Sequence, residues 1–218
     1  MNNAERFGVE AGLTKGGCAM RGTKLATGIG MLAVVMAACG GAVACGKQES
    51  GLAGIPPETV ADYVHAVIEA DRTFYTVQIV ERLQKKGRMV ASENWRVEHT
   101  LPLPAQFLME SGDLAMKTGA KVQYRLIGAW PINQQNGPAT EFEKIGLENV
   151  RTHPERPYTE TVTNGTEQVF RALYADRAVS QACIGCHNAH ARSPKRDFRL
   201  DDVMGGIVIT IPLGKQAG

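Results

Sequence analysis

A Cys-x-x-Cys-His motif at Cys183–His187 constrains this chain more than any other feature of its sequence. The motif is the attachment signal for c-type haem, in which two thiols add to the two vinyl groups of the porphyrin. The two-residue spacer sets the separation of Cys183 and Cys186, and the next residue, His187, offers an imidazole nitrogen as an axial iron ligand. The motif therefore predicts one covalently attached haem c.

A redox-active dithiol and half of a zinc site are the alternative interpretations of this cysteine pair. A zinc site needs further thiol or His ligands at matching spacing, and the sequence holds no second Cys-x-x-Cys pair. A redox dithiol does not require the adjacent His, and it usually opens a helix in a βαβ unit. Here a loop rich in Arg, Pro and Lys follows at residues 191–196. Haem attachment accounts for all three motif residues and is preferred.

The N-terminus has the order expected of an export signal. A short basic segment at 20–24 precedes an apolar run at 25–38, as in secretory signals. Residues 1–19 do not resemble a leader, so Met20 is an alternative translation start. The run is shorter than the roughly 20 residues of a transmembrane helix. Because bacteria attach haem c outside the cytoplasm, the signal agrees with the motif and predicts a periplasmic protein.

Two cysteines near the end of the apolar run resemble bacterial lipoprotein sites. Small residues precede both Cys39 and Cys45, and an unbroken apolar run leads into Cys39, which is preferred. Either would become the lipidated first residue of the mature chain and would anchor it to the membrane; a cleaved signal with incidental cysteines is the alternative. The expected organisation is a leader at 1–45, a flexible tether at 46–56 and a haem-binding domain at 57–218.

The balance of charges excludes one class of partner. The chain has 24 Lys and Arg against 22 Asp and Glu, a net charge of +2. This near-neutral balance implies neither nucleic acid nor an anionic surface as a partner. We expect no disulfide framework, because haem and lipid would occupy the cysteines of the mature chain.

The order of predicted elements indicates an α+β fold. They are a long helix over 57–86, a short helix over 105–118, a strand over 121–130, a polar loop over 131–138, a helix over 140–150 with Thr140 near its N-cap, a strand over 168–174 and a closing strand over 206–212. Helices precede strands with one inserted helix, which favours an antiparallel sheet. The haem motif lies in the connection before the last strand, unlike an ordinary small cytochrome c, which is all-helical with its motif near the N-terminus.

Several short stretches besides the haem motif carry a family resemblance. They are Ala70–Tyr75, Pro102–Ala105, Tyr124–Ile127, Trp130–Asn136, Glu141–Glu143, and Asn188–His190 with Ser193–Lys195. On these residues the chain resembles a family of single-haem, PAS-like periplasmic domains, long catalogued as a domain of unknown function. Members occur alone or as the sensing part of bacterial signalling proteins.

The resemblance implies a PAS-like antiparallel sheet with the haem held between it and the N-terminal helices, and His187 as the proximal ligand. Some members use a Cys on the long N-terminal helix as the second ligand. That helix has no Cys here, and Tyr75 lies near the comparable position, where it would line the pocket. The second ligand therefore stays open, as does a five-coordinate iron. The candidates are His65, His99, His153, His190, Met89, Met109, Met116, Met204 and Tyr75.

Four polar residues are candidates to bind the haem propionates, because guanidinium and amide donors pair with carboxylates. They are Arg72, Arg125, Asn133 and Asn136. The alternatives are a solvated strand face for Arg125 and a purely turn-forming role for the two asparagines.

These features predict a periplasmic, lipid-anchored, mono-haem c-type cytochrome that transfers single electrons with a redox partner protein. The alternative is a haem-based sensor of redox state or a small gas. The chain ends five residues after Leu213 with no effector domain, so a sensor would act through a partner protein. We expect no enzymatic activity, because c-type peroxidases usually carry two haem motifs and one is present.

Overall fold

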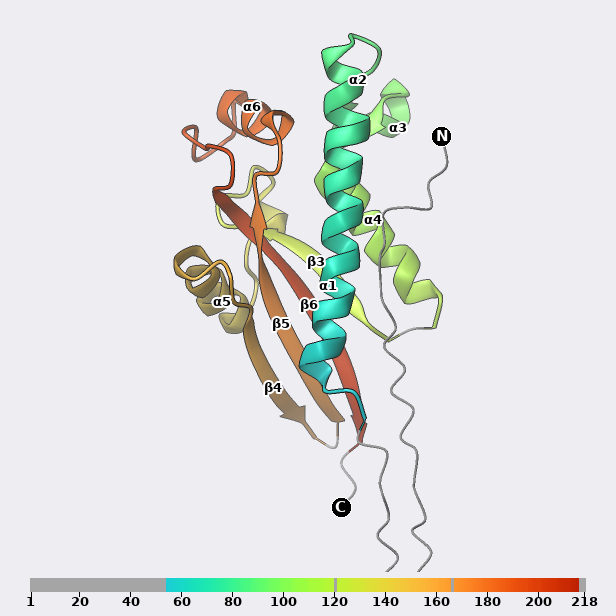
Figure 1. Ribbon diagram of the computed structural model, residues 1–218, viewed down its shortest axis with the longest axis vertical. Helices are drawn as coiled ribbons and strands as arrows, with labels where there is room; N and C mark the ends of the chain where they lie inside the picture. Colours follow the sequence, from blue (N-terminus) through green and yellow to red (C-terminus); the bar gives the residue numbers. More distant parts are fainter. Residues whose placement is uncertain (1–53, 120, 166, 216–218) are drawn as a thin grey trace, which may run out of the picture. The chain divides into compact units, whose positions relative to one another are not determined.

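The domain is built on a four-stranded antiparallel sheet with strand order β3-β6-β5-β4 (Figure 1). The strands are Gln123–Gly128 (β3), Tyr158–Asn164 (β4), Glu167–Arg177 (β5) and Val203–Lys215 (β6). The computed structural model describes residues 54–119, 121–165 and 167–215. The predicted leader and most of the predicted tether lie outside the described residues.

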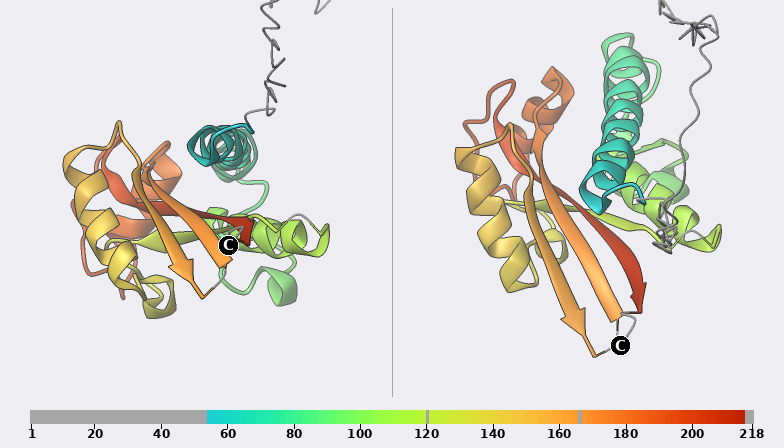
Figure 2. Two further views of the ribbon diagram at one scale, coloured as in Figure 1. Left: turned by 90° about the horizontal axis from the view of Figure 1, so that it is seen from below. Right: turned by 60° about the horizontal axis from the view of Figure 1, so that its bottom comes forward.

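Helices cover both faces of this sheet (Figure 2). They are α1 (Pro57–Phe74), α4 (Pro104–Lys117) and α5 (Glu141–Thr152). Successive strand side chains point to opposite faces. Phe170 and Ile209 therefore pack with α1 and α4, while Leu173 and Val208 pack with α5.

The predicted long helix over 57–86 is confirmed, with one irregularity. α1 continues without a break into a π-helical segment, η1 (Tyr75–Glu81), and then into α2 (Arg82–Lys85). The π-helical geometry is rare and is frequent at functional sites. It lies in the part of the helix that reaches the end of the sheet where α6 lies (Figure 1).

The remaining elements are short. They are β1 (Ala91–Ser92) and β2 (Leu101–Pro102), which pair in parallel, α3 (Trp95–Glu98), the 3-10 turn η2 (Gln134–Asn136) and α6 (Gln181–Ala189). None of the helices in the described ranges is long and apolar enough to cross a membrane.

The predicted α+β class with an antiparallel sheet is confirmed. The predicted N-cap is also found, because the Thr140 hydroxyl accepts from the Glu143 backbone N–H at 3.3 Å. Glu143 completes a capping box by accepting from the Thr140 N–H at 3.1 Å.

Apart from the short elements β1, α3, β2 and η2, which were not predicted, two elements differ from the sequence predictions. β4 was not predicted, since its Thr-rich sequence has no apolar alternation, although its side chains alternate between half-buried and exposed. The haem motif was expected in a loop and lies instead on the helix α6. Ser180 caps this helix by accepting from the Ala182 N–H at 3.1 Å, a local signal that was present in the sequence.

Candidate haem site

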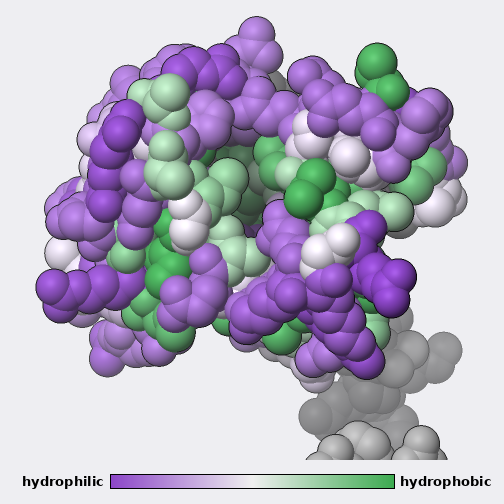
Figure 3. Space-filling model, turned by 90° about the horizontal axis from the view of Figure 1, so that it is seen from above, coloured by the Kyte–Doolittle hydropathy of each residue, from purple (hydrophilic) through white to green (hydrophobic). Residues whose placement is uncertain are grey.

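A cavity of about 910 Å³ opens at the end of the domain that carries α6. Its walls come from η1 and α2, residues 91–94, the start of α4, the end of β3, the loop 130–136 and α6. From above it is a hollow lined by hydrophobic residues and rimmed by hydrophilic ones (Figure 3). Its volume lies near the upper end of the roughly 300–1,000 Å³ typical of ligand and cofactor sites, so it has room for a large cofactor.

The helix α6 brings all three residues of the haem motif to this cavity. Cys183, Cys186 and His187 occupy positions i, i+3 and i+4 of the helix, which share one face, and all three line the cavity. Asn188 holds the end of α6 through two 2.9 Å hydrogen bonds with the backbone of Phe198. These bonds fix the C-terminal end of the helix that carries the motif.

His187 has an environment suited to an iron ligand. Its ring meets Phe198 edge-on, with 5.7 Å between ring centroids, and its Nδ1 atom is buried with no hydrogen-bond partner among the residues that the structure describes. Burial, followed by the charges of His190 and Arg72, lowers the pKa of His187. The neutral imidazole is the form that binds metals, and an unpartnered buried nitrogen costs free energy that a ligand would recover. The residues present thus fit a haem.

The two cysteines differ from a redox-active dithiol. Burial raises the pKa of the Cys186 thiol, and Glu93 and Cys183 add to this effect, whereas nucleophilic redox cysteines have lowered pKa values. Moreover, α6 connects the antiparallel strands β5 and β6, so its setting is not a βαβ unit. Both observations count against the dithiol alternative.

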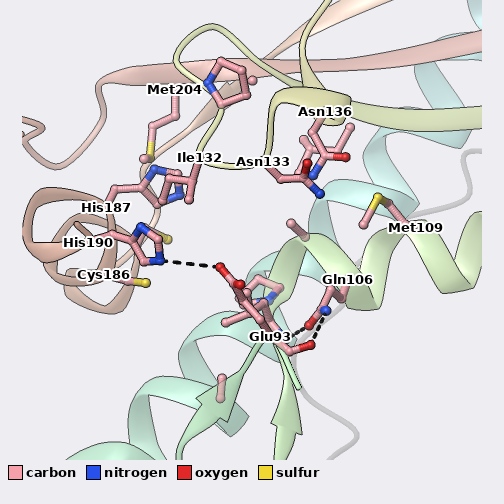
Figure 4. A pocket seen from close by; sticks show the side chains of 18 of the residues that line it. Glu93, Gln106, Met109, Ile132, Asn133, Asn136, Cys186, His187, His190 and Met204 are labelled. Atoms are coloured by element: carbon pink, nitrogen blue, oxygen red, sulfur yellow. Dashed lines mark hydrogen bonds and ion pairs between the residues drawn. The ribbon is translucent and has the colours of Figure 1, made fainter. Parts of the chain in front are cut away.

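The wall across the cavity from α6 is largely polar. Asn133, Asn136 and Gln106 lie there, together with the apolar Met109 (Figure 4). The Asn133 side chain accepts from the Gln135 N–H at 3.1 Å and so also shapes the turn η2. The two predicted propionate asparagines are therefore at the cavity, and Asn133 has the turn-forming role as well.

Arg125 and Tyr75, which were also predicted at the haem, do not line the cavity. The Arg125 guanidinium lies 3.3 Å from the Glu143 carboxylate and donates to the Gly137 carbonyl at 3.1 Å. The Tyr75 hydroxyl donates to the Pro102 carbonyl at 2.7 Å, and burial raises its pKa to about 12. Both side chains bind other parts of the chain, and these contacts hold them outside the cavity lining.

Arg72, the fourth predicted propionate residue, lines the cavity but is committed to a buried ion pair. Its guanidinium lies 2.9 Å from Asp176 on β5, and both side chains are under one-tenth exposed. Burial raises the pKa of Asp176, while Arg72 opposes this change. The Arg72 Nε atom is buried without a partner among the described residues. Sequence reasoning missed Asp176, whose only signal is a carboxylate in an otherwise apolar stretch of β5.

Three of the candidates for the second iron ligand line the cavity: His190, Met109 and Met204. Met204 lies beside His187, whereas Met109 lies across the cavity (Figure 4). The His190 Nε2 atom is 3.5 Å from Glu93, which also accepts from Arg192 at 3.0 Å. The remaining candidates lie outside the cavity lining: His65, His99, His153, Met89, Met116 and Tyr75.

The chain is similar to a known protein family and to a solved structure. The Tll0287-like family model, described as Tll0287, matches residues 56–212. The crystal structure of the cyanobacterial haem protein Tll0287 covers 75% of this chain and 100% of its own, with 18% sequence identity and a TM-score of 0.46. No curated protein matches the chain. Since the family model spans most of its length, the chain belongs to the Tll0287-like family.

Proposed function

We propose that this protein binds a single haem c, attached covalently through Cys183 and Cys186 and ligated by His187, and that it transfers single electrons. The observation that carries the proposal is the placement of all three motif residues on one face of α6 at the wall of a 910 Å³ cavity. The description of its relative Tll0287 as a haem protein supports it.

Each part of the cavity has a role in holding the cofactor. The two thiols would hold the porphyrin, and the neutral His187 imidazole would ligate the iron. On the wall opposite α6, Asn133 and Asn136 present amide donors suited to the propionate carboxylates of a haem. When bound, haem supplies an iron centre that changes its oxidation state by one electron.

The position of the attachment residues favours electron transfer. Cys183 and Cys186 both line a cavity that opens at the surface of the domain (Figure 3), so a group bound to both would have an edge within reach of another protein. A redox partner protein would approach at this edge. We assign the domain no enzymatic turnover.

Acid–organic extraction of the denatured protein tests covalent attachment. We expect haem to stay with the chain and the peptide containing residues 183–187 to carry its mass. The Met116→Leu protein is the control, because this methionine lies outside the cavity lining. Haem that extracts freely would contradict the c-type proposal.

Single substitutions at Met109, Met204 and His190 test the second iron ligand, because these are the candidates at the cavity. The substitution that changes a six-coordinate low-spin spectrum to a high-spin one identifies the ligand. A wild-type protein that is already high-spin and binds carbon monoxide readily would contradict a pure electron carrier and favour the gas-sensor alternative.

We further propose that the protein is periplasmic and lipid-anchored. The apolar run and the small residues before Cys39 and Cys45 support this assignment. Changing both cysteines to Ser should release the protein from membranes. A double variant that stays in the membrane through its own residues would indicate a retained helix instead.

A further inference from the structure

Charge is distributed unevenly along the long helix that begins the domain. The charged side chains exposed in its first part, residues 57–71, are all acidic: Glu58, Asp62, Glu69 and Asp71. Its last turn and the residues after it expose basic side chains instead: Arg82, Lys85, Lys86 and Arg88. The net charge of +2 for the whole chain hides this separation.

The basic end of the helix lies at the mouth of the cavity. α2 lies at the same end of the domain as α6 (Figure 1), and Gln84 of α2 lines the cavity. The loop that follows α6 adds further basic residues at this end, and its Arg192 also lines the cavity. From above, hydrophilic residues surround the hollow (Figure 3). We refer to the eight basic residues of the two segments as the basic rim: Arg82, Lys85, Lys86, Arg88, Arg192, Lys195, Arg196 and Arg199.

Most acidic side chains beside the basic rim are already neutralised. They form ion pairs with three of its members: Glu81 with Lys85, Glu93 with Arg192, and Asp197 with Lys195. Glu98 on α3 instead accepts from the Asn94 amide at 3.4 Å. The other five members of the rim have no acidic partner among the residues that the structure describes: Arg82, Lys86, Arg88, Arg196 and Arg199. The rim therefore keeps an excess of positive charge at the cavity mouth.

We propose that the basic rim docks an acidic redox protein, so that one electron passes between the partner's redox centre and the haem, and one centre is reduced as the other is oxidised. This inference rests on the proposed electron transfer and names the chemistry of its partner. Acidic side chains around the partner's redox centre would steer it to the rim, because complementary potentials raise association rates. Redox encounters use small interfaces, so they do not require a large apolar area.

Exposed apolar side chains beside the rim favour a protein over a dissolved anion as the occupant. Met89, Val90 and Val97 are 40%, 55% and 82% exposed. They flank residues 91–94, which line the cavity. A protein surface would cover these side chains and gain from their burial, whereas a small anion would not.

The position of the rim favours a protein over a membrane surface. The helix runs without a break from Pro57 to Lys85, and at about 1.5 Å per residue its ends lie about 40 Å apart. The proposed lipid anchor precedes Pro57 in the sequence, whereas the rim begins at the other end of the helix. The cavity mouth is therefore at the end of the helix away from the segment that leads to the anchor.

Reduction of the ferric, full-length protein in non-ionic detergent by a reduced flavodoxin, a small acidic carrier of single electrons, tests the docking. The variant Lys86→Glu, Arg88→Glu should lower the second-order rate constant about fivefold at 0.1 M ionic strength, where charges act over about 10 Å. The difference should vanish at 1 M, where this range is about 3 Å.

The matched control is Lys117→Glu, Lys121→Glu, which changes the net charge by the same amount. Both lysines are exposed and, like Lys86 and Arg88, have no ion pair within the described part of the chain. They lie at the end of α4 and just before β3, whereas the start of α4 and the end of β3 line the cavity. The rate constant of this control should stay unchanged at 0.1 M.

Two small oxidants separate a change of local charge from a change of the haem. Oxidation of the ferrous protein by the anionic hexacyanoferrate(III) should slow in Lys86→Glu, Arg88→Glu, whereas oxidation by the cationic tris(phenanthroline)cobalt(III) should accelerate. An altered haem would change both rates in the same direction. An unchanged absorption spectrum and reduction potential verify that the variant is folded.

The outcomes distinguish this inference from the proposed function. A protein that exchanges electrons with neither small oxidant would contradict the proposed electron transfer, and the inference with it. Exchange with both oxidants, combined with a flavodoxin rate that ignores Lys86→Glu, Arg88→Glu, would overturn the docking alone. A Cys39→Ser, Cys45→Ser protein that binds phosphatidylglycerol vesicles, and loses this binding when the rim charges are reversed, would assign the rim to a membrane surface instead.

Discussion

The two ends of the domain differ in how tightly their side chains pack and in whether their buried polar atoms have hydrogen-bond partners. Around β5 and β6 the side chains close on each other, and Phe170, Ile207 and Ile209 are at most 1% exposed. At the α6 end a large cavity replaces that packing. The His187 Nδ1 and Arg72 Nε atoms are buried there without partners in the described part of the chain. The sheet provides stability, whereas the cavity end has polar atoms and space that a cofactor would use.

This difference predicts that the site and the fold can be separated by mutation. The largest effect should come from the double variant Cys183→Ser, Cys186→Ser, which should lose covalent haem completely because both thioether bonds require sulfur. The sheet should remain folded, since neither residue belongs to the two core clusters that contain Phe170 and Leu173. Mass spectrometry and far-ultraviolet circular dichroism measure the two properties. An unfolded double variant would mean that the two ends are not independent.

Truncation of one phenylalanine at each end sharpens the comparison. Phe170→Ala should lower the free energy of unfolding by about 4 kcal/mol, because it leaves a cavity in closed packing, and it should leave the haem absorption spectrum unchanged. Phe198→Ala should change that spectrum, since Phe198 meets the His187 ring edge-on. Chemical denaturation and absorption spectroscopy measure both variants. Equal spectral changes would contradict the separation.

The ion pair between Arg72 and Asp176 lies where the two ends meet. Asp176→Asn should cost about 3 kcal/mol of unfolding free energy, because it leaves the buried guanidinium without a counter-charge. The double variant Arg72→Met, Asp176→Leu should be less destabilised than Asp176→Asn. Glu148→Gln is the control, since its partner Arg151 lies at the surface and exposed pairs contribute less than about 1 kcal/mol.

Local signals were enough to predict much of this molecule. The periodicity of residues 57–86, the cap at Thr140 and the β-branched run at 206–212 each depend on neighbouring residues alone, and the corresponding elements are present. The family resemblance drawn from short motifs is confirmed as well. The motif residues reach the cavity because a helix places positions i, i+3 and i+4 on one face.

The errors in the site concern residues whose partners are distant in the sequence. Arg125 was expected at the cavity, but its direction is decided by Glu143, which belongs to a capping box on another element. Asp176 was not noticed because its partner Arg72 is 104 residues away. Periodicity says which face of an element a side chain occupies, but the neighbour on that face follows only from how the elements pack.

The smallest effect we predict is a pH dependence of stability where α1 packs on the sheet, away from the cavity. His65 stacks on Tyr174, with 3.9 Å between ring centroids, and burial lowers its pKa from the usual 6.5, although Glu69 and Asp62 oppose this change. Below pH 6.5 the unfolded chain therefore binds a proton that the folded protein resists, so stability falls as the pH drops.

His65→Phe keeps an aromatic ring against Tyr174 and removes that proton. Denaturation should show a smaller loss of stability between pH 8 and pH 5 in the variant than in the wild type. The reference is pH 8, where the imidazole is neutral in both the folded and the unfolded protein. Equal losses in both proteins would show that His65 does not carry the effect. Because His65 lies outside the cavity lining, the haem spectrum of the two proteins should be the same across this range.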